Sequence, residues 1–356
     1  MADWIDKPEP LQALVASLSS AQSLALDTEF ERIRTYWPKL ALLQLNPPRP
    51  AALIDTTARL DWGPLGALLA DTPLLIMHSA SEDLIALRTL WPRPPQALFD
   101  TQIAASLAGV GHSLSYQKLV GQMLGVELEK GETRSDWMRR PLSDSQLAYA
   151  VDDVRYLNEI HAALVERLTS QGRLDWVLQE GARMLAAANQ DTIAENLHHD
   201  FRTAFQLPIA SQQKLDHLMV WREQTARELD RPRTWILDHG TAFRLVESPP
   251  ATLQAFNAIV AQDRAFPKAK ANQVFELLGA ALEPRAGFVP APKAPDKADE
   301  IRYKSLRAKI DALAVELGID PGALVSRRLL EARLRDGHWP SDCSAWRSAL
   351  LEPLLQ

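Results

Sequence analysis

The sequence predicts a mixed α/β domain followed by two small all-α domains. Short apolar runs bounded by Pro, Asn, Asp and Thr, a pattern typical of strands, occur near the N-terminus, and helical patterns follow them. After about residue 200 the pattern is helical, with no convincing strand. A chain of 356 residues is long enough for two or three domains with cores of their own.

The predicted strands of the α/β domain are short and lie close together in the sequence. They occupy residues 22–30, 39–45, 50–55 and 73–78, with a fifth around 97–99. The first three follow one another as in a meander. Helical patterns come next, at 81–91, 101–108 and 114–125. We therefore expect one mixed sheet of five strands with helices packed on it.

The clearest predicted helix begins after Ser143. This serine can cap the amide three residues on while Gln146 reaches back, which makes a capping box. Tyr149 and Asp153 lie four residues apart and therefore share one flank of the helix. The apolar stripe of this helix comprises Leu147, Ala150, Val151, Val154, Leu157 and Ile160.

Two helical segments of similar size make up the rest of the chain. Each has a polar basic helix, a turn and then short Leu-rich helices. The stretch between them is rich in Pro, Ala and Lys, which is a linker composition. We predict domains at residues 1–203, 208–283 and 300–356, with a linker at 284–299.

The composition is that of an ordinary globular protein, with 46% hydrophobic and 24% charged residues. The single cysteine, Cys343, excludes an internal disulfide framework and a Cys-rich zinc site, and it suits a reducing cytoplasm. The sequence starts without a signal-peptide pattern, and no apolar run approaches the length of a membrane span. We expect a cytoplasmic protein with no membrane partner.

The net charge of −6 is unevenly distributed along the chain. Residues 1–200 hold 17 Lys and Arg against 26 Asp and Glu, whereas residues 201–356 hold 22 against 19. An acidic part is thus joined to a mildly basic one. Such an asymmetry is a hint about charged partners and says nothing about the fold.

Two acids at the end of the first predicted strand, Asp27 and Glu29, carry the first functional signal. Residues two apart on a strand point to the same face, so these side chains lie together and repel unless a positive charge lies between them. The alternative is a strand end that reaches solvent, with Asp27 beginning a turn.

Two further acids extend this pattern, Asp83 just after the fourth strand and Asp153 beside Tyr149 on the helix. Carboxylate oxygens are the ligands that Mg²⁺ prefers. Acids from three separate elements could hold a metal pair for in-line displacement at phosphorus. Tyr149 would then orient the attacking water, and the alternative is a tyrosine of the core.

The motifs LALDTEFERIRTYWPKLALLQL, IMHSASEDLIAL, FDTQIAASLAGVGHSLSYQKLV, LEKGETRSDWMRRPLS and QLAYAVDDVRYL resemble those of a known family. They are similar to the DEDD exonucleases, in the branch that carries Tyr where others carry His, and within it to the bacterial ribonuclease D family. The resemblance covers nearly the whole chain, and the motifs occur in the family's order and spacing.

The resemblance implies a ribonuclease H-like fold, with a five-stranded mixed sheet, an antiparallel second strand and helices on both faces. It also implies two Mg²⁺ or Mn²⁺ ions, with Tyr149 as the water-orienting residue. Residues 208–283 resemble an HRDC domain, and residues 300–356 resemble a second, divergent copy. The implied metal-binding acids are Asp27, Glu29, Asp83 and Asp153.

Asp152 competes with Asp153 in the VDD triplet, but the Tyr-x-x-x-Asp spacing selects Asp153. Asp100 is expected to cap the following helix, His78 to be a structural histidine and Trp221 to lie in a core.

The segment 130–140 is a candidate RNA-binding element because it combines four cationic residues with a tryptophan. Such a segment can hold phosphates and stack a base, as single-strand binders do. The alternative is a solvated basic loop. The candidate residues are Lys130, Arg134, Trp137, Arg139 and Arg140.

The resemblance implies a 3′→5′ exoribonuclease that releases 5′-mononucleotides and trims the 3′ ends of tRNA precursors and other small structured RNAs. Its partner would be RNA with a single-stranded 3′ end, and we expect a monomer. One alternative is a DNA 3′→5′ exonuclease, since recognition of the 2′-OH separates the two substrates. The other is a non-catalytic RNA-binding scaffold.

Overall fold

The computed structural model describes residues 2–46, 50–129, 131, 132, 135–263 and 265–355. The chain forms two compact units. Unit 1 comprises the described parts of Met1–Glu31, Lys39–Gln190 and Lys297–Gln356, and unit 2 comprises those of Arg32–Pro38 and Asp191–Asp296.

Unit 1 is built on a mixed sheet of six strands in the order β1-β4-β3-β2-β5-β6. Strands β2, β3 and β4 form the predicted antiparallel meander, while β5 and β6 continue the sheet in parallel beside β2. The strands are β1 (Asp3–Ile5), β2 (Ser23–Glu31), β3 (Lys39–Asn46), β4 (Ala52–Asp55), β5 (Leu74–Met77) and β6 (Leu98–Asp100).

The sheet has one strand more than the five predicted. The additional strand, β1, has only three residues and pairs in parallel with β4 at the edge of the sheet. Three residues are too few to show the alternation by which a strand is recognised in a sequence.

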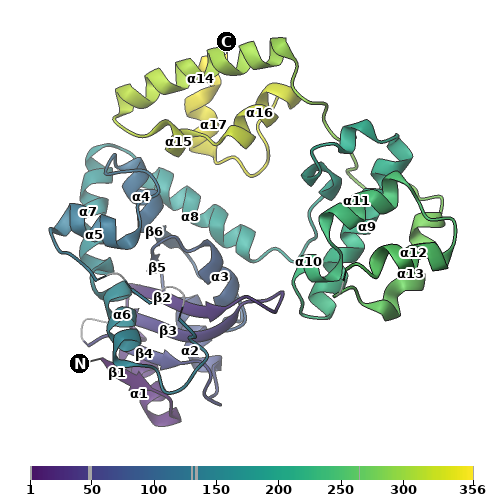
Figure 1. Cartoon of the computed structure of the whole chain (residues 1–356). Coiled ribbons are helices and arrows are strands. Elements are labelled where there is room, and N and C mark those ends of the chain that lie inside the picture. The colour runs from purple at the N-terminus through teal and green to yellow at the C-terminus, as the bar shows by residue number, and fades with distance from the viewer. Residues whose placement is uncertain (1, 47–49, 130, 133–134, 264, 356) are drawn as a thin grey trace. The chain divides into compact units, whose positions relative to one another are not determined.

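Helices cover both faces of the sheet (Figure 1). Leu24 and Leu26 point to the face on which α1 (Pro8–Leu18), α2 (Gly63–Asp71) and α3 (Ser81–Leu87) pack. Each fully buried leucine stabilises the fold by roughly 1.5–3 kcal/mol. The intervening residue Ala25 points to the other face, which is covered by α4 (Thr101–Leu107), α5 (Tyr116–Leu124), α7 (Leu157–Ser170) and α8 (Leu174–Ala188).

Helix α6 (Asp144–Arg155) begins at the predicted capping box. The Ser143 hydroxyl accepts a hydrogen bond from the Gln146 amide at 3.2 Å, and the Gln146 side-chain oxygen accepts one from the Ser143 amide at 3.0 Å. The helix lies on β3, because Ala150 packs in one cluster with Leu42, and Asn46 donates to the Val154 carbonyl at 2.9 Å.

The predicted apolar stripe from Leu147 to Ile160 lies on two helices instead of one. The helical conformation is interrupted at Tyr156, which lies between α6 and α7 and has φ −107° and ψ 2°. The Tyr156 amide donates to the hydroxyl of Tyr116 on α5 at 3.1 Å. This tertiary contact, which no local pattern shows, satisfies the amide at the break.

The C-terminal segment of the chain packs within unit 1 (Figure 1). Its helices bury Leu306, Ile310 and Leu330 in the core that also holds α4 and α7. Trp346 stacks on Trp176 of α8, with ring centroids 4.4 Å apart and an interplanar angle of 9°. The helices are α14 (Lys297–Leu317), α15 (Pro321–Leu324), α16 (Arg327–Asp336) and α17 (Ala345–Leu351).

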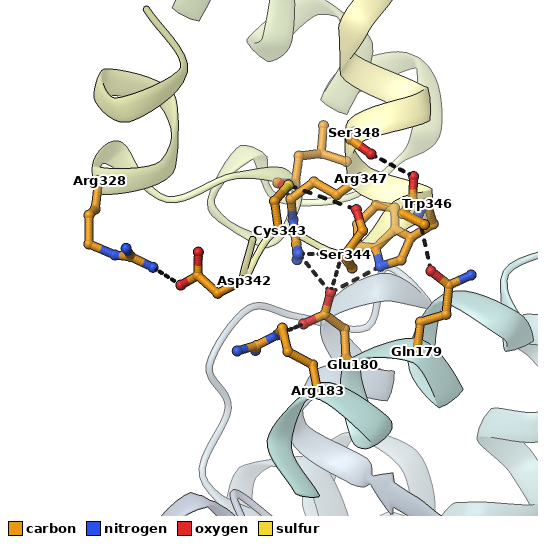
Figure 2. Close-up of polar contacts among 12 residues, drawn as sticks. Gln179, Glu180, Arg183, Arg328, Asp342, Cys343, Ser344, Trp346, Arg347 and Ser348 are labelled. Carbon is orange, nitrogen blue, oxygen red and sulfur yellow. Dashed lines mark hydrogen bonds and ion pairs between the residues drawn. The ribbon is translucent and has the colours of Figure 1, made fainter. Parts of the chain in front are cut away.

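One buried carboxylate ties this C-terminal segment to α8. Glu180 is 2% exposed, and it accepts hydrogen bonds from Ser344, Trp346 and Arg347 at 2.6, 3.0 and 2.6 Å (Figure 2). Arg183 donates to its second oxygen at 2.9 Å. A buried carboxylate is stable only when it is paired and hydrogen-bonded, so the segment supplies the partners that Glu180 needs.

Unit 2 is all-helical, with Trp221 buried in its core as predicted. Short 3-10 turns precede and interrupt its helices. Residues from the predicted linker pack against this unit, since Arg285 pairs with Asp216 at 3.0 Å and the Ala291 amide donates to Gln212 at 2.7 Å. The helices are α9 (Ile209–Glu228), α10 (Arg233–Ile236), α11 (His239–Glu247), α12 (Leu253–Val260) and α13 (Ala271–Gly279).

The turn between β2 and β3 also belongs to unit 2. The amides of Tyr36 and Trp37 both donate to the Asp230 carboxylate at 3.0 Å. The Tyr36 hydroxyl is buried among Glu223, Arg227 and Arg233, to which it is hydrogen-bonded. The seven residues between β2 and β3 are therefore part of unit 2, and two of them, Tyr36 and Trp37, pack in its hydrophobic core.

Replacing Glu180 with Ala is expected to lower the free energy of unfolding of unit 1 by about 3–5 kcal/mol, because Arg347 keeps its buried charge without the carboxylate that pairs with it. Urea unfolding followed by tryptophan fluorescence measures this change. Glu166→Ala on the exposed side of α7 is the matched control, expected within about 0.5 kcal/mol of the unmodified chain. Equal effects of the two substitutions would contradict the role of Glu180.

Candidate active site

Three elements of unit 1 deliver the predicted acids and tyrosine. Asp27 and Glu29 lie on β2, near the centre of the sheet. Asp83 lies in the first turn of α3, just after β5. Tyr149 and Asp153 lie one turn apart on α6, which is fixed to β3 as described above. The packing of α6 therefore decides whether the five side chains meet.

The structure brings these five side chains together. Asp27 interacts electrostatically with Glu29, Asp83 and Asp153, and the Tyr149 hydroxyl is hydrogen-bonded to Asp153. Thr28, on the opposite face of β2, donates to the Asp83 carboxylate at 2.5 Å and so fixes the orientation of that side chain. The predicted site residues thus form a single cluster.

Burial and mutual repulsion hold protons on this cluster. Burial, followed by the charges of Asp153 and Asp83, raises the pKa of Glu29 to about 9. Burial also raises the pKa of Asp153 to about 7, against the hydrogen bond from Tyr149. The pKa of Asp83 rises to about 6 mainly through burial, and the pKa of Asp27 rises well above its usual value for the same reason. Full ionisation of all four acids would need a positive charge nearby.

The chemistry of this donor set fits a hard divalent cation, which prefers carboxylate oxygens. A cation would also offset the burial and the repulsion that raise these pKa values. Among the residues that the structure describes, no three His, Cys, Asp or Glu side chains already form a group able to hold a metal ion. The acids share one patch, and their oxygens would have to draw closer to coordinate a cation.

Tyr149 is a hydrogen-bond donor and not a base in this arrangement. Burial and the neighbouring carboxyls Asp153 and Glu29 raise the pKa of Tyr149 far above its usual value, so the hydroxyl keeps its proton. The backbone of Gly131 lies against the ring, because a Cβ atom at residue 131 would come within 1.7 Å of it. Glycine at this position lets the chain cover Tyr149.

Sequence reasoning did not identify Gly131 or Thr28 as site residues. Gly131 lies in the LEKGETRSDW motif, where a glycine among polar residues was a signal of close backbone approach. Thr28 lies between the two acids of β2 in the sequence, but its side chain points to the opposite face of the sheet. Its contact with Asp83 therefore depends on how α3 packs against that strand. Neither role follows from local patterns alone.

The structure confirms the modest roles predicted for Asp100 and His78. Asp100 caps α4, because its carboxylate accepts hydrogen bonds from the amides of Gln102 and Ile103 at 2.9 and 3.0 Å. His78 lies between the Thr101 hydroxyl, at 2.9 Å, and the Leu114 carbonyl, at 3.1 Å. Asp100 also accepts a hydrogen bond at 2.8 Å from the amide of Ala80, the residue just before the helix that carries Asp83.

The candidate RNA-binding segment has a mainly structural role where it is described. Trp137 is 5% exposed and packs near Tyr149, with ring centroids 6.0 Å apart, so this burial contradicts a stacking platform for a base. Arg140 forms a forked pair with Asp55, at 2.6 and 2.8 Å. Arg139 is exposed. Lys130 and Arg134 lie outside the described residues.

The sheet, its flanking helices and the acid cluster define a 3′→5′ exonuclease of the ribonuclease H-like fold. A family model described as 3′-5′ exonuclease matches residues 2–169, and an HRDC domain model matches residues 211–278. The exonucleases of this family depend on divalent metal ions.

Curated relatives cover the whole chain. Ribonuclease D of Xanthomonas oryzae pv. oryzae is 43% identical over 100% of this chain and 99% of its own length. Ribonuclease D of Pseudomonas paraeruginosa is 33% identical over 97% of this chain and 94% of its own. The chain belongs to the ribonuclease D family, and it is a 3′→5′ exoribonuclease.

A solved structure agrees with this family. The crystal structure of Escherichia coli RNase D, described as an exoribonuclease involved in structured RNA processing, matches with a TM-score of 0.88 at 28% identity. The match covers 100% of this chain and 99% of that one. The likeness therefore includes the helical segments as well as the exonuclease domain.

The raised pKa of Glu29 predicts a pH dependence of stability without metal. An acid whose pKa is higher in the folded than in the unfolded state stabilises the fold fully below its unfolded value and loses that contribution as pH rises through its folded value. For Glu29 this window runs from about 4.3 to about 9. In EDTA, the melting temperature of Glu29→Gln should therefore fall less with pH than that of the unmodified chain.

The matched control for this measurement is Glu31→Gln, two residues further along β2. It should melt with the same pH slope as the unmodified chain. Identical slopes for Glu29→Gln and Glu31→Gln between pH 5 and about 9 would show that the Glu29 carboxyl is not held protonated by the cluster.

Proposed function

We propose that the chain hydrolyses RNA from a single-stranded 3′ end with two Mg²⁺ or Mn²⁺ ions and releases 5′-mononucleotides. The observation that carries the proposal is the gathering of four carboxyl groups from three elements beside a tyrosine that keeps its proton. Asp27, Glu29, Asp83 and Asp153 would hold the ions. Two ions are proposed because an in-line displacement has an attacking and a leaving oxygen to stabilise.

When bound, the cations supply positive charge at the scissile phosphate and activate the attacking water. The side chains of the site then determine the position of the attacking water. The Tyr149 hydroxyl donates a hydrogen bond to the Asp153 carboxylate, which leaves the hydroxyl oxygen free to accept a hydrogen bond from the attacking water and orient it. The backbone at Gly131 limits the movement of the tyrosine ring.

Tyr149 cannot act as the general base in this scheme, because burial beside acids keeps its pKa far above neutrality. Orientation is therefore its proposed contribution. A well-oriented reactant pair can gain several kcal/mol over a freely diffusing one.

The proposed substrates are tRNA precursors and other small structured RNAs. The description of the Escherichia coli relative as an enzyme of structured RNA processing supports this, as does the HRDC domain match. Unit 2 has an open cleft lined by two phenylalanines, a histidine and two arginines, and also by the acids Asp200 and Glu247. Its rings could stack a base and its arginines could contact a phosphate. The lining residues with these side chains are Phe201, Arg202, His239, Phe243 and Arg244.

A DNA 3′→5′ exonuclease is the second candidate function, because the same acids would serve either nucleic acid. Rates on matched RNA and DNA oligonucleotides separate the two, since only RNA offers a 2′-OH. The ribonuclease D relatives over the whole chain favour RNA.

A monomer in the cytoplasm is the proposed state of the enzyme. The single cysteine, which is free, suits a reducing compartment. None of the helices in the described ranges combines the length and the hydropathy that crossing a bilayer requires.

Replacing Asp153 with Asn should lower the rate of mononucleotide release from a 3′-tailed tRNA by roughly a hundredfold or more, the scale set by losing one charge-stabilising group. Products resolved at nucleotide length, with and without EDTA, give direction, metal need and stopping point together. EDTA should abolish the reaction of the unmodified chain.

Asp152→Asn is the matched control, because Asp152 precedes Asp153 on α6 and pairs at 3.6 Å with Arg155 on the helix flank. Its rate should stay within about threefold of the unmodified chain. Full activity in Asp153→Asn would remove Asp153 from the site, and products longer than mononucleotides would exclude stepwise 3′ trimming.

The double substitution Arg202→Glu and Arg244→Glu should weaken binding of a structured RNA while leaving hydrolysis of a trinucleotide unchanged. Each lost phosphate contact should reduce the slope of log affinity against log salt by about 1. Filter binding over a salt series measures both effects.

Arg231→Glu, on an exposed position of unit 2 that does not line the cleft, is the control for net charge. A loss of affinity equal to that of one cleft substitution would mean that charge alone, and not the cleft, attracts the RNA.

A further inference from the structure

The side-chain amide of Gln44, on β3, is buried without a hydrogen-bond partner. The residue is 0% exposed, and neither its oxygen nor its nitrogen bonds any group within the described residues. A buried polar group without a partner costs about 1–3 kcal/mol. A leucine of similar size at this position would avoid that cost, so the amide needs an explanation.

Gln44 differs from the other buried side chains that have polar atoms without a hydrogen-bond partner. In the described part of the chain it is the one that leaves two polar atoms unpaired, whereas each of the others leaves one. Those others are Thr56, Trp91, Trp137 and Arg222. A tryptophan or arginine can bury a single N–H group as a by-product of its size, but Gln44 is small enough for an apolar residue to replace it.

Gln44 lies directly opposite Asp27 in the antiparallel pair of β2 and β3. Opposite residues of such a pair point to the same face, with Cβ atoms about 4.5–5.5 Å apart. The amide therefore lies beside the carboxyl that interacts with all three of the other acids. This placement follows from the register of the two strands.

Helix α6 closes the space above Gln44. On one side along β3, Leu42 packs in one cluster with Ala150, and on the other side Asn46 donates to the Val154 carbonyl at 2.9 Å. Because Leu42, Gln44 and Asn46 share one face, the amide lies under the helix that carries Tyr149 and Asp153. It is thus enclosed among the elements of the site.

We propose that Gln44 is a positioning residue for Asp27. Its Nε2–H group donates to the Asp27 carboxylate when that carboxylate ligates the cations, and so fixes the orientation of the carboxylate. The inference rests on the metal-binding role proposed above for Asp27. A neutral amide suits this task, because a lysine or arginine at the same place would repel the cations it helps to position.

The amide would then lack a partner in the metal-free chain and gain one when metal binds. Removing it should consequently have opposite effects on the two states. A glutamine that only fills space would not produce this opposition, because its loss would act on both states alike. The two effects can be measured on the same full-length protein.

The test is Gln44→Leu in the full chain. In EDTA the melting temperature should rise by a few degrees, because the orphaned amide is gone. Calorimetric titration with Mn²⁺ alone should show binding weakened by about 10–100-fold, the scale for losing a group that orients a metal ligand. With RNA, kcat should fall while KM stays within about twofold.

Two further variants make the outcome decisive. Leu42→Met, on the same strand face and under the same helix, controls for repacking and should leave the Mn²⁺ affinity unchanged. Asp27→Asn tests the metal site itself. If Asp27→Asn binds Mn²⁺ as the unmodified chain does, the proposed function fails at its metal site.

If Asp27→Asn loses Mn²⁺ binding but Gln44→Leu keeps it within about twofold, only the role of Gln44 is overturned. A Gln44→Leu chain that melts below the unmodified chain in EDTA, or does not fold, overturns it as well. That result would mean that the amide already has a partner without metal, such as a buried water.

Discussion

The burial of four neighbouring carboxyl groups, together with their mutual repulsion, is the constraint on which the rest of unit 1 depends. Asp27 and Glu29 lie together on a central strand, and Asp83 and Asp153 face them from two helices. Such a cluster opposes folding at neutral pH, so the surrounding structure has to stabilise the arrangement. The apolar layers on both sides of the sheet and the anchoring of α6 supply that stabilisation.

The same requirement accounts for the polar contacts around the cluster. Thr28 holds Asp83, Tyr149 holds Asp153, and the capping box fixes where α6 begins. Each contact orients a carboxyl without neutralising it. The acids therefore remain able to exchange their protons for cations. The hydroxyl donors that orient them are neutral, so they do not change the net charge of the site.

Two pairs of site residues could be predicted from the sequence because their spacing is local, whereas Asp83 was expected from its place after the fourth strand and from the family resemblance. Asp27 and Glu29 follow the two-residue period of a strand, and Tyr149 and Asp153 follow the turn of a helix. The capping of α4 by Asp100 was predictable for the same reason. The fold class and the family resemblance are confirmed by the sheet and by the relatives. The metal roles stay predictions.

What could not be predicted depends on contacts between distant segments. The break at Tyr156 needs the hydroxyl of Tyr116, the burial of Trp137 needs the neighbouring α6, and the orphaned amide of Gln44 appears only with the strand register. The packing of the C-terminal segment on α8 through Glu180 joins residues more than 160 positions apart, as the separation of Glu180 and Arg347 shows. Sequence periodicity carries no information on such pairs.

The turn at residues 32–38 has a consequence for the order in which the protein can be completed during synthesis. Tyr36 emerges from the ribosome long before Glu223, Arg227 and Arg233, because these hydrogen-bond partners of its hydroxyl are translated 187, 191 and 197 residues later. Unit 1 in turn waits for Ser344 and Arg347 to cover Glu180. Neither unit corresponds to a contiguous stretch of the gene, and a chain cut at residue 190 would leave both sets of groups uncovered.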